Sequence, residues 1–81
     1  MAVSEMTVTI IVGGTPHEWP KGEITFIEVV KLEFTDYNPA TTYKVKYTNG
    51  HGHKPEGQIP PGGSVKVKEG MIFSVSTTGQ S

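Results

Sequence analysis

The chain has 81 residues, 35% of them hydrophobic, with ten Gly, six Pro and no Cys, and this length corresponds to one small domain. Its net charge of −1, from seven basic and eight acidic residues, argues against nucleic-acid binding, which draws affinity from surplus Lys and Arg. No apolar run approaches the roughly 20 residues of a membrane span, and the missing cysteines exclude disulfides, thiolate zinc sites and thiol nucleophiles.

The composition favours a β-rich fold. Nine Val, six Ile and ten Thr stand against one Leu and two Ala, and branched side chains pack well on a pleated sheet but lose rotamer freedom in helices. Residues 1–5 lack a basic region followed by an apolar segment, so we expect no secretory signal. Together with the missing cysteines, this predicts a cytoplasmic protein.

Residues 6–20 predict a β-hairpin. Val8, Ile10 and Val12 fall on one face and Thr7 and Thr9 on the other, as in a strand with one buried face. Gly13 and Gly14 supply the positive φ angles of a tight turn. Residues 15–19 then read as a return strand that ends at Pro20.

Residues 24–34 show helical spacing, with apolar side chains at Ile27, Val30 and Phe34. Thr25 and Glu28 fit a capping box, in which each side chain accepts a hydrogen bond from the backbone N–H of the other residue. The pattern predicts one helix of about three turns that ends before the Asn-Pro pair at 38–39.

The rest of the chain reads as strands separated by turns. Residues 43–47 and 71–75 alternate, residues 64–68 alternate over a shorter stretch, and Ile59 lies in a very short extended piece. Turns are expected at 48–57, 60–63 and 69–70, where Gly, Pro and Asn gather. We expect an α+β chain with the β-grasp arrangement, a mixed sheet of four or five strands with one helix on one face. Residues 1–75 form the domain and 76–81 a flexible polar tail.

No constellation of residues predicts catalysis or metal binding. The serines and threonines lack the neighbouring base that a nucleophile needs, and no pair of acids sits in an apolar setting. His51 and His53 could place two imidazoles together, but a third ligand is missing and His17 lies in a separate strand. We therefore expect no enzyme activity, no metal and no cofactor on this chain.

Lysines alternate along two of the predicted strands, at positions 44, 46, 66 and 68. They either contact an acidic partner or keep the sheet soluble and discourage edge pairing, and the second interpretation is the commoner in natural sheets. The tail has a similar choice of interpretations. An uncharged extension with a small residue, Gly79, can enter a narrow cleft as an extended peptide, while a frayed terminus is the more general case.

Two segments resemble the bacterial multiubiquitin family. The first is Tyr43-x-Val45-x-Tyr47-x-Asn49-Gly50. The second runs Ile59-Pro60-Pro61-Gly62-x-x-Val65-x-Val67-Lys68-x-Gly70-Met71-x-Phe73-x-Val75. Together with the opening hairpin and the helix, the resemblance covers nearly the whole chain.

The resemblance implies a ubiquitin-like β-grasp protein modifier. An activating-enzyme-like protein would use ATP to adenylate the C-terminal carboxylate, a conjugating-enzyme-like protein would pass the modifier to target proteins, and a deconjugating peptidase would remove it. The conjugation tail would be Thr78, Gly79, Gln80 and Ser81. Because the chain does not end in Gly-Gly, three alternatives stay open: trimming to Gly79, use of Ser81 as the reacting terminus, or no conjugation at all.

Ubiquitin-like domains usually meet partners on the sheet face opposite the helix. We expect Lys44, Lys46, Ile72 and Ser74 on that face, where a one-residue slip in the last strand would exchange Ile72 for Phe73. The rival interpretation is a ubiquitin-like module that uses the same face for non-covalent binding and has an inert tail. No nucleic acid or membrane is expected among the partners.

Overall fold

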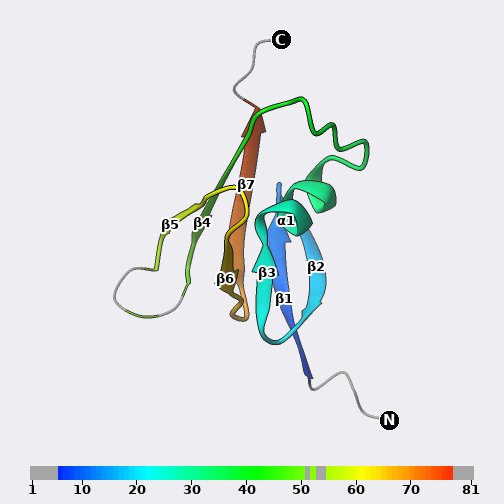
Figure 1. Ribbon diagram of the computed structural model, residues 1–81. Coiled ribbons are helices and arrows are strands. Elements are labelled where there is room, and N and C mark those ends of the chain that lie inside the picture. The colour runs from blue at the N-terminus through cyan, green and yellow to red at the C-terminus, as the bar shows by residue number, and fades with distance from the viewer. Residues whose placement is uncertain (1–5, 51, 53–54, 78–81) are drawn as a thin grey trace.

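The hairpin at the start of the chain forms as its alternation predicts. The computed structural model describes residues 6–50, 52 and 55–77 (Figure 1). Strands β1 (Thr7–Val12) and β2 (Thr15–Pro20) pair antiparallel, with Val12 opposite Thr15. Gly13 and Gly14 close the turn with φ angles of +60° and +84°, which side chains with a Cβ rarely adopt.

The sheet is completed from distant parts of the chain. Strands β4 (Tyr43–Thr48), β5 (Gly57–Ile59) and β7 (Met71–Thr77) join the hairpin in the order β2-β1-β7-β4-β5. The first and last strands, β1 and β7, lie side by side and run parallel at the centre, and the other pairs are antiparallel. This mixed five-stranded sheet with one helix packed on it confirms the predicted α+β β-grasp fold.

Helix α1 (Phe26–Glu33) is shorter than predicted. Its eight residues make just over two turns, and the capping box is confirmed: the Glu28 N–H donates to Thr25 Oγ1 at 3.2 Å, and the Thr25 N–H donates to Glu28 Oε1 at 2.9 Å. The helix begins at Phe26, directly after the predicted N-cap Thr25, and Ile24, at the start of the segment with helical spacing, is not part of it. Ile24 lies in β3 (Glu23–Thr25), which pairs with β6 (Ser64–Lys66) in a second, two-stranded sheet.

The helix also ends earlier than the proline predicts. Phe34 is the C-cap, in extended conformation with φ −118° and ψ 99°, and its N–H still donates to Val30 O. The chain therefore leaves the helix four residues before Asn38. The loop that follows is fixed locally, because Ala40 N–H donates to Asn38 Oδ1 at 2.9 Å and Thr41 N–H to Asn38 O at 2.9 Å.

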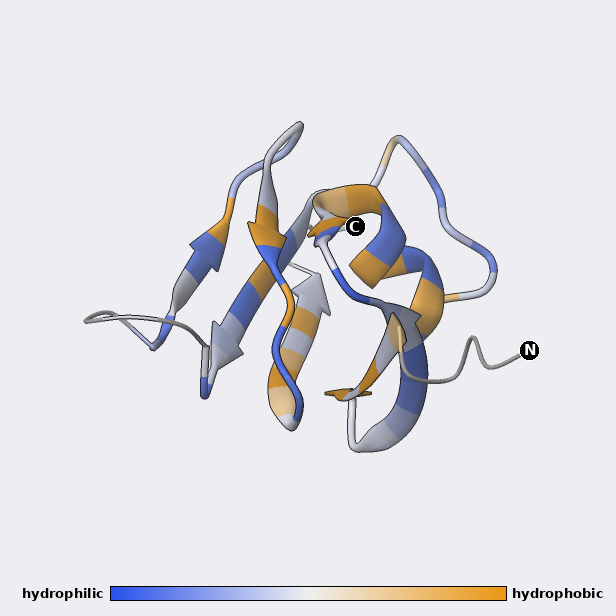
Figure 2. Cartoon of the chain, turned by 90° about the horizontal axis from the view of Figure 1, so that it is seen from below, coloured by the Kyte–Doolittle hydropathy of each residue, from blue (hydrophilic) through white to orange (hydrophobic). Residues whose placement is uncertain are grey.

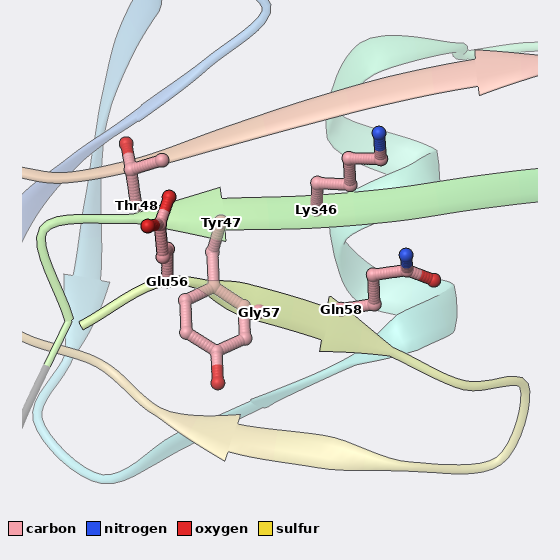
Figure 3. A pocket seen from close by; sticks show the side chains of 6 residues that line it. All are labelled: Lys46, Tyr47, Thr48, Glu56, Gly57 and Gln58. Carbon is pink, nitrogen blue, oxygen red and sulfur yellow. The ribbon is translucent and has the colours of Figure 1, made fainter. Parts of the chain in front are cut away.

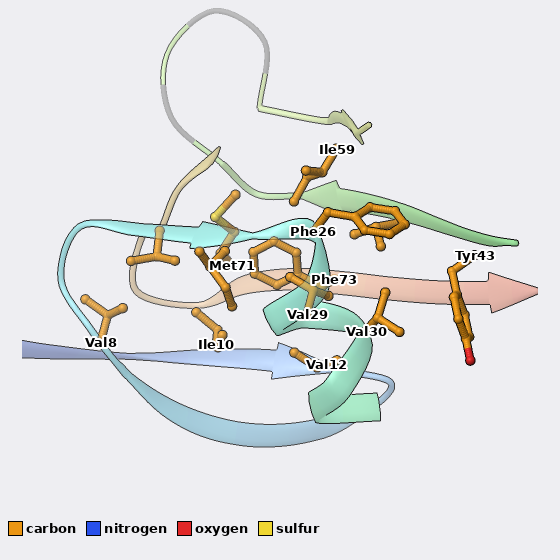
Figure 4. Close-up of a cluster of buried hydrophobic side chains, with 13 residues drawn as sticks. Val8, Ile10, Val12, Phe26, Val29, Val30, Tyr43, Ile59, Met71 and Phe73 are labelled. Carbon is orange, nitrogen blue, oxygen red and sulfur yellow. The ribbon is translucent and has the colours of Figure 1, made fainter. Parts of the chain in front are cut away.

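One hydrophobic core lies between the helix and the sheet (Figure 4). Every buried side chain among the described residues is hydrophobic. The alternating hydrophobic and hydrophilic positions of the strands that deliver these side chains are visible in Figure 2. The buried set is Val8, Ile10, Val12, Ile24, Phe26, Val29, Val30, Tyr43, Val45, Ile59, Val67, Met71 and Phe73. Phe73 is among the largest of them and is 1% exposed.

Strand β7 runs two residues further than the alternation predicts. Ser76 pairs with Lys44 and Thr77 with Tyr43, so both belong to the sheet rather than to a tail. Their polar side chains are exposed to solvent. Polarity alone therefore resembles a tail even where the backbone is paired.

Candidate functional site

The sheet face opposite the helix carries the four residues expected to bind a partner. Lys46 lies opposite Ser74 in the β4–β7 register, and Lys44 lies opposite Ser76, two residues further toward the end of β7. Ile72 lies at the other end of β7. All four side chains are exposed and alternate with buried ones, so they share one face. We call this surface the open face.

Apolar side chains form the middle of the open face. Ile72, which is 44% exposed, lies beside Ile11 of β1, and Ile11 lies beside Pro16 of β2. On the other side Ile72 is opposite Thr48. The open face thus has an apolar row across β2, β1 and β7, with the ammonium groups of Lys44 and Lys46 further along β4. Such a row is suited to contact with another protein, since exposed apolar surface is stabilised when it is covered.

The β2 edge of the sheet offers few backbone groups for strand addition. Gly13 N–H donates to β7 at 3.1 Å, and Thr9 O accepts from the turn before β7 at 2.7 Å, so alternate residues of β1 bond to β2 instead. In that register the backbone groups of Pro16, Glu18 and Pro20 point outward. Two of these three residues have no N–H, so an added strand would find one donor there.

A shallow hollow of about 260 Å³ lies at the opposite edge, between β4 and β5 (Figure 3). It borders the open face, since Lys46 and Gln58 are cross-strand partners there. The Tyr47 ring lies against the backbone of Gly57, where an added Cβ would be 2.9 Å from Tyr47 Oη. Glycine at 57 is what allows this aromatic side chain to cover the edge strand.

A second hollow lies where the described chain ends. Thr77, the last residue of β7, is paired with Tyr43, and Tyr43 lines a pocket of about 260 Å³ on the helix side of the sheet. We call it the Tyr43 pocket. Its walls are Phe26, Ile27, Tyr37, Pro39, Thr41, Thr42, Tyr43, Pro61 and Gly62. The predicted tail residues Thr78, Gly79, Gln80 and Ser81 follow and lie outside the described residues.

Lys66 and Lys68 do not lie on the open face, unlike Lys44 and Lys46, the other two lysines of the alternating pattern. They line a hollow of about 440 Å³ together with Lys21, Glu69 and the apolar side chains of Val8 and Val67. Lys68 Nζ lies 3.5 Å from Gly50 O, and Glu69 Oε1 accepts from Thr9 N–H at 2.9 Å. All four lysines of the alternating pattern are exposed.

The histidines form no metal site in the part of the chain that the structure describes. His17 lies in β2 with its Nε2 atom buried and without a hydrogen-bond partner, and His51 and His53 are outside the described residues. Within the described ranges, no three His, Asp or Glu side chains come close enough to hold a metal ion. Nor does any helix there have the length and apolar character to cross a membrane.

The Tyr43 pocket is the feature that reasoning from the sequence missed. Its residues come from the helix, from the loop that leads into β4 and from the turn between β5 and β6. No local sequence pattern therefore predicts it. The sequence signal for the pocket is the group of aromatic and proline residues in 34–43, a segment that otherwise reads as a connecting loop.

Comparison with protein families gives one match, to the multiubiquitin family, over residues 8–79. No curated protein and no solved structure matches the chain. The family match covers all of the elements described above except the first residue of β1, and it agrees with the resemblance of the segments around Tyr43 and Phe73. The chain belongs to the multiubiquitin family and is a ubiquitin-like domain.

Proposed function

We propose that this chain is a protein modifier of a bacterial ubiquitination-like pathway, activated at its C-terminus and joined to target proteins in the cytoplasm. The observation that carries the proposal is the family match, which runs to residue 79 and so includes Thr78 and Gly79. In this role the chain performs no catalysis itself. An activating-enzyme-like protein, a conjugating-enzyme-like protein and a deconjugating peptidase supply the chemistry.

The activation step makes one demand on the chain. The C-terminal carboxylate displaces pyrophosphate from ATP to form an acyl-adenylate, so the residues before it must enter the partner's active site as an extended peptide. The four residues after Thr77 are Thr78, Gly79, Gln80 and Ser81, which carry no charged side chain. Gly79 adds no bulk beyond the backbone. This composition supports entry into a narrow site, whether the reacting residue is Ser81 or a trimmed Gly79.

The open face supports recognition by these partners. Lys44, Lys46, Ile72 and Ser74 are exposed on it, and the β2 edge is poorly suited to strand addition. Side chains on a face, rather than backbone pairing at an edge, are therefore the proposed mode of contact. Burial of Ile72 and its apolar neighbours provides affinity, and the lysines orient an acidic surface.

A non-covalent interaction module with an inert tail is the second candidate. It is favoured by the apolar row of the half-buried Ile11 and the exposed Ile72, which by itself provides a contact area and requires no tail. The two functions differ in one property: only a modifier consumes ATP in a reaction that depends on the tail.

The test combines the chain with an activating-enzyme-like protein encoded in the same genome and with ATP, and it follows pyrophosphate release and intact mass. A modifier gives a covalent adduct on the full-length chain, and the adduct disappears when residues 78–81 are deleted. A chain that ends at Gly79 is assayed in parallel, and loss of the Gln-Ser mass after treatment with a deconjugating peptidase demonstrates trimming. If neither the full-length nor the Gly79-terminated chain is activated, the modifier function is refuted.

A further inference from the structure

The Tyr43 pocket is held in shape by contacts on two of its walls. Tyr43 Oη accepts a hydrogen bond from the Asn38 N–H at 3.1 Å, and the Tyr43 ring lies 5.5 Å from the rings of both Phe34 and Tyr37. The Lys31 ammonium lies 5.7 Å from the centre of the Tyr37 ring, within the range of a cation–π contact. The aromatic wall is therefore ordered before any ligand arrives.

The opposite wall is fixed as well. The N–H of Phe26, at the start of the helix, donates to Gly63 O at 3.0 Å, and Gly63 N–H donates to Pro60 O at 2.8 Å. These bonds attach the turn that carries Pro61 to the helix. A preformed pocket loses little conformational entropy when it is filled, which favours binding.

The lining defines the chemistry of the occupant. No charged side chain lines the pocket, and most of its walls are aromatic rings, prolines and Ile27. Its volume of about 260 Å³ is below the roughly 300–1,000 Å³ of small-molecule sites. A pocket of this size and polarity suits one large apolar side chain of a protein, the arrangement by which buried anchor residues dominate interfaces.

The position of the pocket points to a protein that binds the tail as the partner. Thr77 is paired with Tyr43, and paired residues of antiparallel strands have Cα atoms about 4.5–5.5 Å apart. The Cα atoms of consecutive residues are about 3.8 Å apart, so the tail starts within one residue of this pair. A protein that binds the chain after Thr77 can therefore reach the pocket with residues that lie next to its tail-binding groove. The pocket is on the helix side of the sheet, whereas the lysines are on the open face.

We propose that the Tyr43 pocket receives a large aliphatic or aromatic side chain of the protein that activates the tail, and so holds the domain while the tail is in the active site. The proposal rests on the proposed function for the identity of its partner. The pocket would be a second contact area for the partner, in addition to the open face, and it lies on the opposite side of the sheet. Recognition then depends on the domain and the tail together, so a free peptide with the tail sequence is a poor substrate.

The test closes the pocket without disturbing the core. Thr42 is exposed and lines the pocket, so Thr42→Trp is chosen to fill the space with an indole. Thr15→Trp is the matched control, because Thr15 is also exposed but lies in β2 at the other edge of the sheet. A second pair, Tyr37→Ala and Tyr37→Phe, removes or keeps the aromatic wall. Thermal melts by circular dichroism verify that each variant is folded.

The readout is ATP–pyrophosphate exchange by the activating-enzyme-like protein, with the modifier concentration varied. We expect Thr42→Trp and Tyr37→Ala to raise KM at least tenfold with kcat within about twofold, and Thr15→Trp to leave both constants unchanged. Tyr37→Phe keeps the ring, so its KM is expected to rise less than that of Tyr37→Ala. Calorimetric titration of the same protein without ATP gives the binding constants directly. If wild type is not activated, the proposed function fails, and the titration still decides about the pocket. Equal KM or Kd values for Thr42→Trp and wild type overturn the inference.

Discussion

Phe73→Ala is the substitution that tests the packing most directly. Phe73 lies in the central part of β7, is 1% exposed and has its ring 6.3 Å from the ring of Tyr47. Burial of a phenylalanine side chain contributes roughly 1.5–3 kcal/mol from the apolar surface alone. The empty space left behind adds to this, so the expected loss in the free energy of unfolding is about 3–5 kcal/mol.

The total stability sets the scale of this loss. At roughly 0.05–0.15 kcal/mol per residue, a chain of 81 residues has about 4–12 kcal/mol. Urea denaturation followed by circular dichroism measures the difference, and Phe73→Leu provides a milder variant in case the alanine chain does not fold. Ile72→Ala is the matched control on the open face, where 44% of the side chain is already exposed. A loss below 1 kcal/mol for Phe73→Ala would show that the faces of β7 are reversed.

Three further variants probe individual features. Thr25→Ala removes one hydrogen bond of the helix capping box and is expected to cost about 1 kcal/mol in urea denaturation, while an unchanged midpoint would contradict the role of the cap. Gly57→Ala forces the Tyr47 ring to move and is expected to cost roughly 1–3 kcal/mol; in a double-mutant cycle this cost falls when Tyr47 is alanine, and additive costs would refute the clash. Replacing Pro16 and Pro20 together by threonine restores two outward N–H donors and should increase self-association in light scattering, whereas unaltered mass at high concentration would show that the prolines do not protect the edge.

Local patterns in the sequence predict the elements whose causes are local. Val8, Ile10 and Val12 are buried together because a strand with one covered face repeats every second residue. Thr25 and Glu28 are three residues apart, which is the spacing that the capping box requires. In these cases the sequence neighbours are also the physical partners.

The features that were missed depend on distant partners. The sequence predicts no strand at Ile24, just before the helix, but pairing with Val65 of β6 places it in one. Ser76 and Thr77 look like a tail until Lys44 and Tyr43 are placed beside them. A three-residue strand or a polar strand end has too little pattern of its own to announce a partner that lies dozens of residues away.

The same limit applies to the candidate site. The exposure of Lys44, Lys46, Ile72 and Ser74 follows from simple alternation. The Tyr43 pocket does not, since three separate segments build it and only the folded chain brings them together.

The parallel pairing of β1 and β7 has a mechanical consequence. The strands lie side by side, and β1 begins at one end of the molecule while β7 ends at the other (Figure 1). A force that pulls these two ends apart acts along the strands, so it loads the hydrogen bonds between them simultaneously instead of opening them one after another. The domain is thus built to withstand tension applied between these two ends, because the central pair of strands must shear before they separate.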